Sequence, residues 1–352
     1  MICHFANNAY DAFSESPSDY KGLPRETYGR EVFYDLPDPK LKQATQWLIG
    51  NPNRINLGRI GLRYKCDTLN ASDITNPRQV LDLWNGIITS TFEIVGKAVR
   101  VVTQGDLDSD AVAISIESEL VQSGDLNVEL DFPFPPIHST QYKYEVFAGV
   151  YDFPSNHTTT LIEDGKDRAS AHIQHVLQET SYYVNLRWPK SLPLRLSRNK
   201  FPNSTTTTAH RYTLSPISST SSLAFTAHFS PDSRVPSPPA KIQNQSARGW
   251  AEYWKDGGFV DLTASKNPNA TELQRRIIRS QYHVRVNSAA HGQPPQESGL
   301  MNNGWYGRSR LQAAIAHSSL IIDRQVSHGD GYLAPRSVVD MGQAAIFRSH
   351  LP

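Results

Sequence analysis

A two-residue alternation of apolar and polar side chains runs through the chain from about residue 54 to residue 229. Side chains at every second position share one face of a strand, so this period predicts strands and not helices. Short turns such as Gly105-Asp106 and Ser123-Gly124-Asp125 predict antiparallel neighbours. That many strands in one run predicts a large antiparallel β-sandwich. The expected strands are 53–64, 87–95, 98–103, 111–117, 126–132, 172–177, 181–188, 210–214 and 223–229.

Two local patterns inside this region bear on possible sites. His172 and His175 are three positions apart, a spacing that suits a metal chelate on a helix. Their surroundings predict a strand, where positions three apart point to opposite faces, so we expect a poor chelate. The stretch Asp82-Leu-Trp-Asn-Gly86 predicts a hairpin turn, with Trp84 in the core.

Helical periodicity appears only at the two ends of the chain. Near the start, Asp38 and Pro39 predict the first turn of a helix that stops at Gly50-Asn51-Pro52. After the strands, residues 230–248 carry four prolines and several serines, which predicts a semi-extended linker.

Beyond the predicted linker, Trp250, Tyr253 and Trp254 share one face of a short expected helix that ends at Gly257-Gly258. A longer helix is expected from Pro268 or Asn269 to about Ala290. Its apolar stripe consists of Leu273, Ile277 and Val284.

Composition excludes several function classes. The 352 residues carry a formal charge of +1, so no basic surface for nucleic acid is expected. No apolar run approaches the roughly 18–20 residues of a membrane span, and the start lacks the features of a secretory signal. No cofactor motif and no phosphate loop is present. Five sequons, at Asn70, Asn156, Asn203, Asn244 and Asn269, nevertheless favour a secretory ancestry.

The stretch from Tyr282 to Arg308 holds the candidate site. Pro294 and Pro295 fix the backbone ahead of Gln296 and Glu297, and Trp305 and Tyr306 follow. A carboxylate can act as acid or base on a glycosidic oxygen, amides bind hydroxyl groups, and aromatic faces cover the apolar side of a sugar. The alternative is a surface loop followed by a capped helix start.

Several stretches resemble a known family. The phrase EYWKDGGFVDLTASKNPNATELQRRIIRSQYHVRVNSAAHGQPPQESGLMNNGWYG is similar to the six-hairpin glycosidases, the (α/α)6-barrel superfamily near glycoside hydrolase families 65 and 95. QWLIGNPNRINLGRIGL, QVLDLWNGIITSTFEI, VELDFPFP and TSYYVNLRW resemble the N-terminal sandwich of that group. The resemblance covers about residues 1–308 and implies cleavage of glycosidic bonds by hydrolysis or phosphorolysis, with a carbohydrate substrate.

The same resemblance suggests roles for individual residues. Glu297 matches the family's Gln-Glu-Thr-Gly-Leu stretch, which implies a catalytic or substrate-gripping carboxylate. Gln296, Trp305 and Tyr306 would contact the substrate. Trp254 and Asp261 are weaker candidates of the same kind.

The chain also departs from the family. Arg310 and Gln312 stand where the family has histidine and glutamate, and residues 317–352 resemble nothing in it. We therefore expect a fragment truncated at both ends. It would comprise a sandwich over 1–229 lacking its first strands, a linker over 230–248, the first helices of an incomplete (α/α)6 barrel over 249–316, and a divergent tail.

Two functions remain open at this point. The first is a glycoside hydrolase-like protein whose catalysis is impaired because one carboxylate cannot serve both catalytic roles. The second is a non-catalytic, carbohydrate-binding or remnant sandwich. Exposed apolar faces are expected in either case, because Leu273, Trp250 and Trp254 would pack on barrel helices that the chain does not supply.

Overall fold

The computed structural model describes residues 23–34, 38–42, 56–65, 67–134, 149–151, 153–163, 169–177, 180–199 and 209–288. The predicted helix at 38–50 and the tail at 317–352 lie mostly or wholly outside these residues. Within them, Asp38 does begin a turn, since its carboxylate accepts a hydrogen bond from the Lys40 amide at 2.8 Å.

Fifteen strands and five helical segments make up the described part of the fold. The first nine strands are β1 Leu23–Thr27, β2 Arg30–Tyr34, β3 Arg59–Tyr64, β4 Asp67–Thr68, β5 Ile74–Asp82, β6 Ile87–Ile94, β7 Lys97–Gly105, β8 Ala111–Glu117 and β9 Leu126–Asp131. The others are β10 Thr158–Glu163, β11 Ser170–Leu177, β12 Thr180–Arg187, β13 Leu194–Arg198, β14 Arg211–Pro216 and β15 Ser222–Ser230. The helices are α2 Glu119–Gln122, α4 Pro239–Tyr253, a π-turn at Trp254–Gly258 and α5 Ala270–Ser288, with a short 3-10 turn at Ala71–Asp73.

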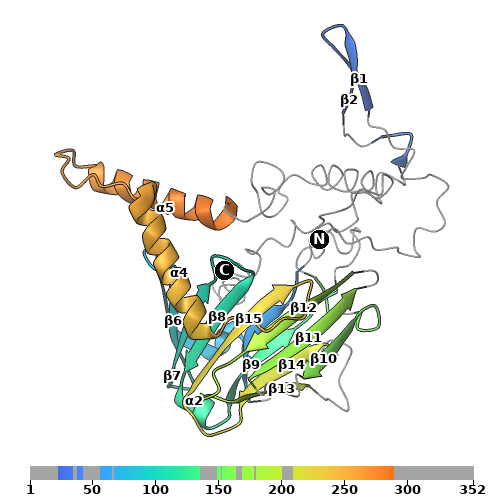
Figure 1. Cartoon of the computed structure of the whole chain (residues 1–352), viewed down its shortest axis with the longest axis vertical. Coiled ribbons are helices and arrows are strands. Elements are labelled where there is room, and N and C mark those ends of the chain that lie inside the picture. Colours follow the sequence, from blue (N-terminus) through green and yellow to red (C-terminus); the bar gives the residue numbers. More distant parts are fainter. Residues whose placement is uncertain are drawn as a thin grey trace.

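The strands form two large antiparallel sheets. One has eight strands in the order β10-β11-β12-β15-β8-β7-β6-β5, and the other has five in the order β13-β14-β9-β3-β4. A two-stranded hairpin of β1 and β2 stands away from both sheets (Figure 1). Every pairing within the sheets is antiparallel, as the short turns predict.

The two sheets pack face to face over a single apolar core. Alternation along β6 shows how this arises, because every second residue, from Ile88 to Ile94, is buried while the residues between them are partly exposed. The five-stranded sheet contributes Val128, Leu130 and Tyr212 to the same cluster. The predicted fold class, a large antiparallel sandwich followed by helices, is thus confirmed in its β-rich, few-helix character.

Strand β5 is the longest strand that the sequence pattern missed. Its middle contains Pro77, which lacks an amide hydrogen, and its register with β6 shifts between Thr75 and Arg78. The alternation is broken at that bulge, so the period-two signal disappears. Because β5 is an edge strand, the proline is tolerated there.

The turn between β5 and β6 is a hairpin turn, as predicted, but Trp84 is not in the core. The Trp84 side chain is 43% exposed, so that expectation was wrong. Its neighbour Leu83 instead packs against the cluster of Trp250, Trp254 and Tyr282. One position along a tight turn is enough to exchange the inward and outward side chains.

Helix α4 begins at Pro239, nine residues before the end of the expected linker at residue 248. Pro238 has extended backbone angles of −66° and 154°, and Pro239 occupies the first helical turn, where its missing amide hydrogen costs nothing. Residues 231–238 remain without helix or strand. The prolines therefore start a helix here instead of marking a spacer over the whole of 230–248.

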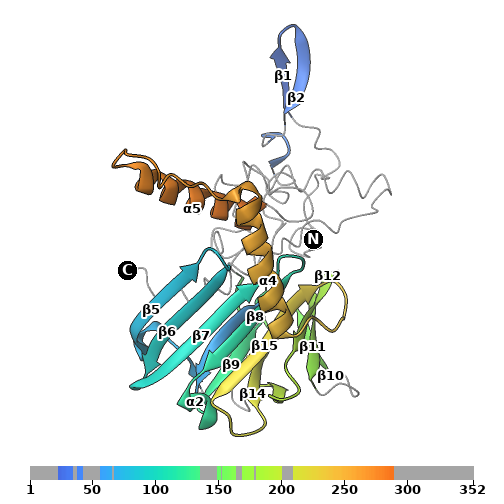
Figure 2. The same cartoon turned by 60° about the vertical axis from the view of Figure 1, so that its left-hand side comes forward.

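Helix α4 lies across the outer face of the eight-stranded sheet. Figure 2 shows it over β8 and β15, and its Ile242 packs on Ala111 and Ala113 of β8. The two alanines leave room for the helix to approach the sheet closely. The helix therefore fixes the start of the C-terminal segment on the sandwich.

Helix α5 covers the range expected from its caps, but it buries a different face. Leu273 and Val284 of the predicted stripe are 52% and 63% exposed. The buried contact comes from Tyr282, with Ile278 and Val286 packed beside it. Two members of the predicted stripe are thus exposed apolar side chains, as expected, whereas Trp250 and Trp254 are buried, contrary to expectation.

Candidate functional site

An aromatic cluster holds α5 against the C-terminal end of α4. The Trp250 ring stacks on Tyr282 with centroids 4.9 Å apart and on Trp254 at 6.0 Å. The Arg285 guanidinium lies 4.4 Å from the Tyr253 ring centroid, a cation–π distance. We call the contact made by these five residues the helix junction. It fixes the course of the chain as far as the end of α5.

A glycine permits the junction to rest on the sandwich. Gly86, in the turn between β5 and β6, has a φ of +66°, and a Cβ placed on it would lie 2.2 Å from Trp250 Nε1. No side chain fits there without moving the indole. The turn and the tryptophan are therefore in direct contact, which binds the helices to the edge of the eight-stranded sheet.

The structure describes two of the predicted site residues. Trp254 is 2% exposed, and its indole N–H donates to the Leu83 carbonyl at 2.7 Å. Asp261 is exposed and accepts a hydrogen bond from the Thr263 amide at 2.9 Å. The Thr263 side chain, and after it this amide, lowers the pKa of the Asp261 carboxyl. In this arrangement Trp254 anchors the junction and Asp261 caps a turn.

The other predicted site residues, Gln296, Glu297, Trp305 and Tyr306, lie outside the described residues. They follow α5, whose described part ends at Ser288. Their roles remain predictions. What the structure adds is the anchoring of the helix that precedes them.

The sequence pattern did not single out Asp110, which directly precedes β8. Burial raises the pKa of its carboxyl to about 7, while the positive charge of Arg234 opposes the rise. Burial also lowers the pKa of His228 to about 4, with Arg234 acting in the same direction. His228 lies on β15, the neighbour of β8, and the Phe229 amide after it donates to the Asp110 carbonyl at 3.0 Å.

Three buried polar atoms of this part of the molecule are unpaired among the described residues. Asp110 Oδ1, His228 Nδ1 and, on the sheet-facing side of α4, Ser246 Oγ have no hydrogen-bond partner within the described part of the chain. A carboxyl that titrates near neutral pH is suited to proton transfer. Asp110 is therefore an acid–base candidate. Its signal was hidden because Asp106–Asp110 has the composition of an ordinary turn.

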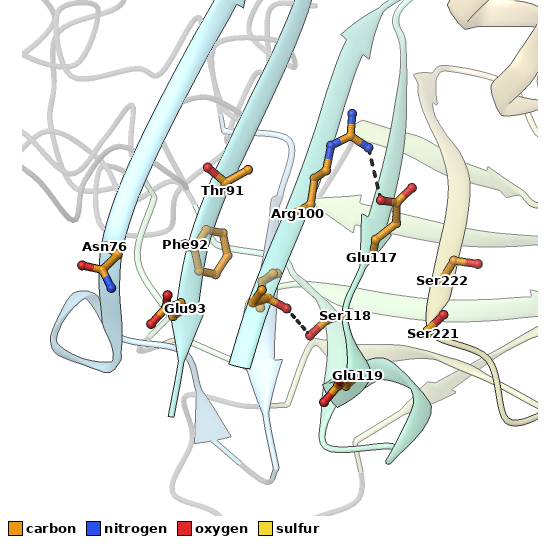
Figure 3. Close-up of a pocket in the computed structure, with 12 residues that line it drawn as sticks. Asn76, Thr91, Phe92, Glu93, Arg100, Glu117, Ser118, Glu119, Ser221 and Ser222 are labelled. Carbon is orange, nitrogen blue, oxygen red and sulfur yellow. Dashed lines mark hydrogen bonds and ion pairs between the residues drawn. The ribbon is translucent and has the colours of Figure 1, made fainter. Parts of the chain in front are cut away.

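Two hollows in the sandwich are less suited to a polar substrate. The first, with a volume of about 660 Å³, lies on the outer face of β6, β7 and β8 (Figure 3). There Arg100 pairs with Glu117 at 3.2 Å, and Lys97 pairs with Glu119 at 2.8 Å. Its cations are already neutralised by neighbouring carboxylates.

The second hollow is a cleft of about 390 Å³ between the two sheets, beside β3 and β5. Apolar side chains form most of its wall, among them Ile60, Leu62 and Phe92. A sugar needs hydrogen-bonding groups on several sides, so this cleft does not fit one.

The described segments hold neither a metal-type cluster nor a membrane-spanning helix. None of their histidine, cysteine and acidic side chains form a group of three or more that could hold a metal ion. Among the helices of these segments, none is long and apolar enough to cross a bilayer. His172 and His175 lie on opposite faces of β11, as the strand prediction required.

Comparison with known proteins gives little. No protein-family model matches this chain, and no curated protein matches it. Among solved structures, a candidate kojibiose phosphorylase from the human microbiome aligns at 10% identity and a TM-score of 0.21. The alignment covers 74% of this chain and 32% of that protein, so this chain spans about a third of its length.

Proposed function

We propose that this chain is a glycoside hydrolase-like, carbohydrate-binding protein whose catalytic power is impaired. Its substrate stretch is 289–308, with Glu297 as the pocket carboxylate and Gln296, Trp305 and Tyr306 as sugar contacts. Trp254 would support the pocket from the junction, and Asp261 from the following loop. The family resemblance of these stretches is the ground for the proposal.

The helix junction is the observation that carries this proposal. A sugar pocket needs its carboxylate and its aromatic platform held in fixed geometry. The stacking of Tyr282 on Trp250 and of Arg285 on Tyr253 anchors the last turns of α5, from which residues 289–308 continue. The sandwich thus serves as the support for α5.

The proposal of impaired catalysis rests on the number of carboxylates. Inverting cleavage requires an acid and a base roughly 6.5–9.5 Å apart. The stretch 289–308 contains one acidic residue, Glu297. We therefore expect this chain to bind oligosaccharides but to cleave them slowly or not at all.

A binding and turnover experiment tests the proposal on the full chain. Titration calorimetry with a panel of gluco- and fuco-oligosaccharides should show binding, and Trp305→Ala and Gln296→Ala should each weaken it by tenfold or more. Glu252→Gln is the matched control, because Glu252 is an exposed acid on α4 that pairs only with Arg248 in the described contacts. It should bind like the wild type. Failure of every oligosaccharide to bind would overturn the proposal.

Turnover separates the two functional readings. Aryl glycosides and the same oligosaccharides are incubated with the protein, with and without inorganic phosphate. Activity that Glu297→Gln abolishes and Glu252→Gln preserves would establish an enzyme with Glu297 as a catalytic residue. Binding without turnover would establish the non-catalytic alternative.

A further inference from the structure

Three histidines meet inside the sandwich, far from the helix junction. His157 precedes β10, His175 lies on β11, and His210 directly precedes β14 of the opposite sheet. Their side chains are 4%, 0% and 6% exposed. The rings of His157 and His210 approach to 3.8 Å between centroids, and those of His157 and His175 to 4.9 Å. We call these three residues, with Thr159, Tyr182 and Tyr212, the histidine core.

The hydrogen bonds of the first chain fix where the protons lie. Tyr182 Oη donates to the Leu57 carbonyl, so it accepts from His175 Nδ1 at 2.6 Å. His175 Nδ1 therefore carries the proton, and His175 Nε2 is left to accept. It accepts from His157 Nδ1 at 2.7 Å. The Leu57 carbonyl can only accept, and this fixes the donor and acceptor of every hydrogen bond in the chain.

A second chain runs in the same way to another carbonyl. His210 Nε2 faces the Pro154 carbonyl at 2.8 Å and must be the donor. His210 Nδ1 therefore accepts from Thr159 Oγ1 at 3.0 Å, and Thr159 accepts in turn from Tyr212 Oη at 2.9 Å. All three imidazoles are neutral in this scheme, and five of their six nitrogens are engaged.

Burial disfavours an added proton in the core, and two charges of the described residues act on it in opposite directions. The charged groups that act on it are Arg198, which opposes protonation of His210, and Asp131, which favours it. Burial is the largest cause of a lowered pKa at all three histidines, and it brings the pKa of His157 to about 3. A proton on His175 Nε2 would also face the N–H of His157.

We propose that the histidine core is a pH-sensitive switch that holds the two sheets together when neutral and releases them in acid. His157, Thr159 and His175 belong to the eight-stranded side, and His210 and Tyr212 to the five-stranded side. Protonation breaks the chains that cross between the sheets. The sandwich then opens at β10, β11 and β14 before it unfolds as a whole.

The direction with pH follows from the lowered pKa. The ordinary pKa of 6.5 applies in the open state, and about 3 applies to closed His157. Stability from this residue is therefore present above about pH 6.5 and is lost progressively as the pH falls toward 3. Between pH 7 and pH 5 each imidazole that protonates only in the open state should raise the opening constant about 20-fold.

Hydrogen–deuterium exchange on the full chain tests the switch. Peptides covering 157–177 and 209–216 are followed at pH 7 and pH 5, with rates corrected for intrinsic exchange. We expect their opening constants to rise by at least about 20-fold, while those of 87–105 change much less. A uniform change along the sandwich, or none at the core, would contradict the proposal.

Substitutions test whether the imidazoles are the cause. His157→Asn keeps a donor toward His175, and His210→Gln keeps a donor toward the Pro154 carbonyl, but neither side chain titrates. The double variant should lose most of the local acid response. His172→Asn is the control, since His172 is buried on the opposite face of β11 and contacts Asn185 instead. If the double variant does not fold, the peptide-level pattern in the wild type decides by itself.

Discussion

Two buried polar networks lie on opposite faces of strand β14, and their polar groups find partners in different ways. His210 and Tyr212 face the sandwich interior and belong to the neutral histidine core. Arg211, between them, faces outward and meets Asp131, with its Nη2 2.8 Å from Asp131 Oδ2. We call Arg59, Arg211, Glu129 and Asp131 the arginine–carboxylate network. The polar groups on one face of the strand are thus paired by hydrogen bonds between neutral side chains. Those on the other face are paired by ion pairs.

The two networks should respond to acid with opposite sign. Burial is the largest cause that raises the pKa of both Glu129 and Asp131, although Arg211 opposes it. A raised pKa means that the folded state gains stability as the pH falls through it. The histidine core loses stability over the range below pH 6.5. Acid sensitivity of this sandwich therefore comes from its neutral network.

The largest expected effect comes from removing the positive charge of Arg211 beside Asp131. Asp131 is 1% exposed and its Oδ2 accepts from both Arg59 and Arg211. Arg211→Met leaves the Asp131 and Glu129 carboxylates buried with only Arg59 beside them among the described residues, so we expect the free energy of unfolding to fall by about 3–5 kcal/mol. Urea denaturation at pH 7 measures this.

The exposed pair of Arg100 and Glu117 provides the control for that variant. Glu117→Gln should cost less than about 1 kcal/mol, because both side chains are about half exposed and solvent screens them. Equal losses in the two variants would show that burial does not distinguish the inner pair from the surface pair.

A smaller loss in the free energy of unfolding is expected when the Tyr182 hydroxyl is removed from the histidine core. Tyr182→Phe removes the hydroxyl that links His175 Nδ1 to the Leu57 carbonyl. Two buried polar groups lose their partner, which should cost about 1–3 kcal/mol in urea denaturation. Tyr183→Phe, at the next position on the strand and on its other face, should cost less than about 0.5 kcal/mol. Equal stability of the Tyr182→Phe and Tyr183→Phe variants would contradict the proposed chain of hydrogen bonds.

The alternation of apolar and polar residues predicted most of the strands, because successive side chains of a half-buried strand point to the core and to solvent in turn. Strand β8 was predicted at its observed bounds of Ala111–Glu117. The signal failed where backbone geometry departs from that rule, as at the bulge of β5 and the tight turn at Trp84. The prolines of 236–239 were ambiguous, since a proline can interrupt a chain or start a helix.

The buried networks could not be predicted from the sequence. The Arg211–Asp131 pair joins residues 80 positions apart, and the Tyr182–Leu57 bond spans 125 positions. Such pairs depend on sheet order, which alternation does not specify. For the site, the sequence indicated Trp254 and Asp261, and the structure shows their local roles, while Asp110 emerged only from its burial directly before β8.

Nitrogen-15 NMR of the imidazoles at pH 7 tests the central claim most directly, namely that a neutral and directional hydrogen-bond network joins the two sheets. The account predicts neutral rings with the proton on Nδ1 in His157 and His175 and on Nε2 in His210. Nε2-protonated His157 or His175, or a charged imidazolium at any of the three, would contradict it.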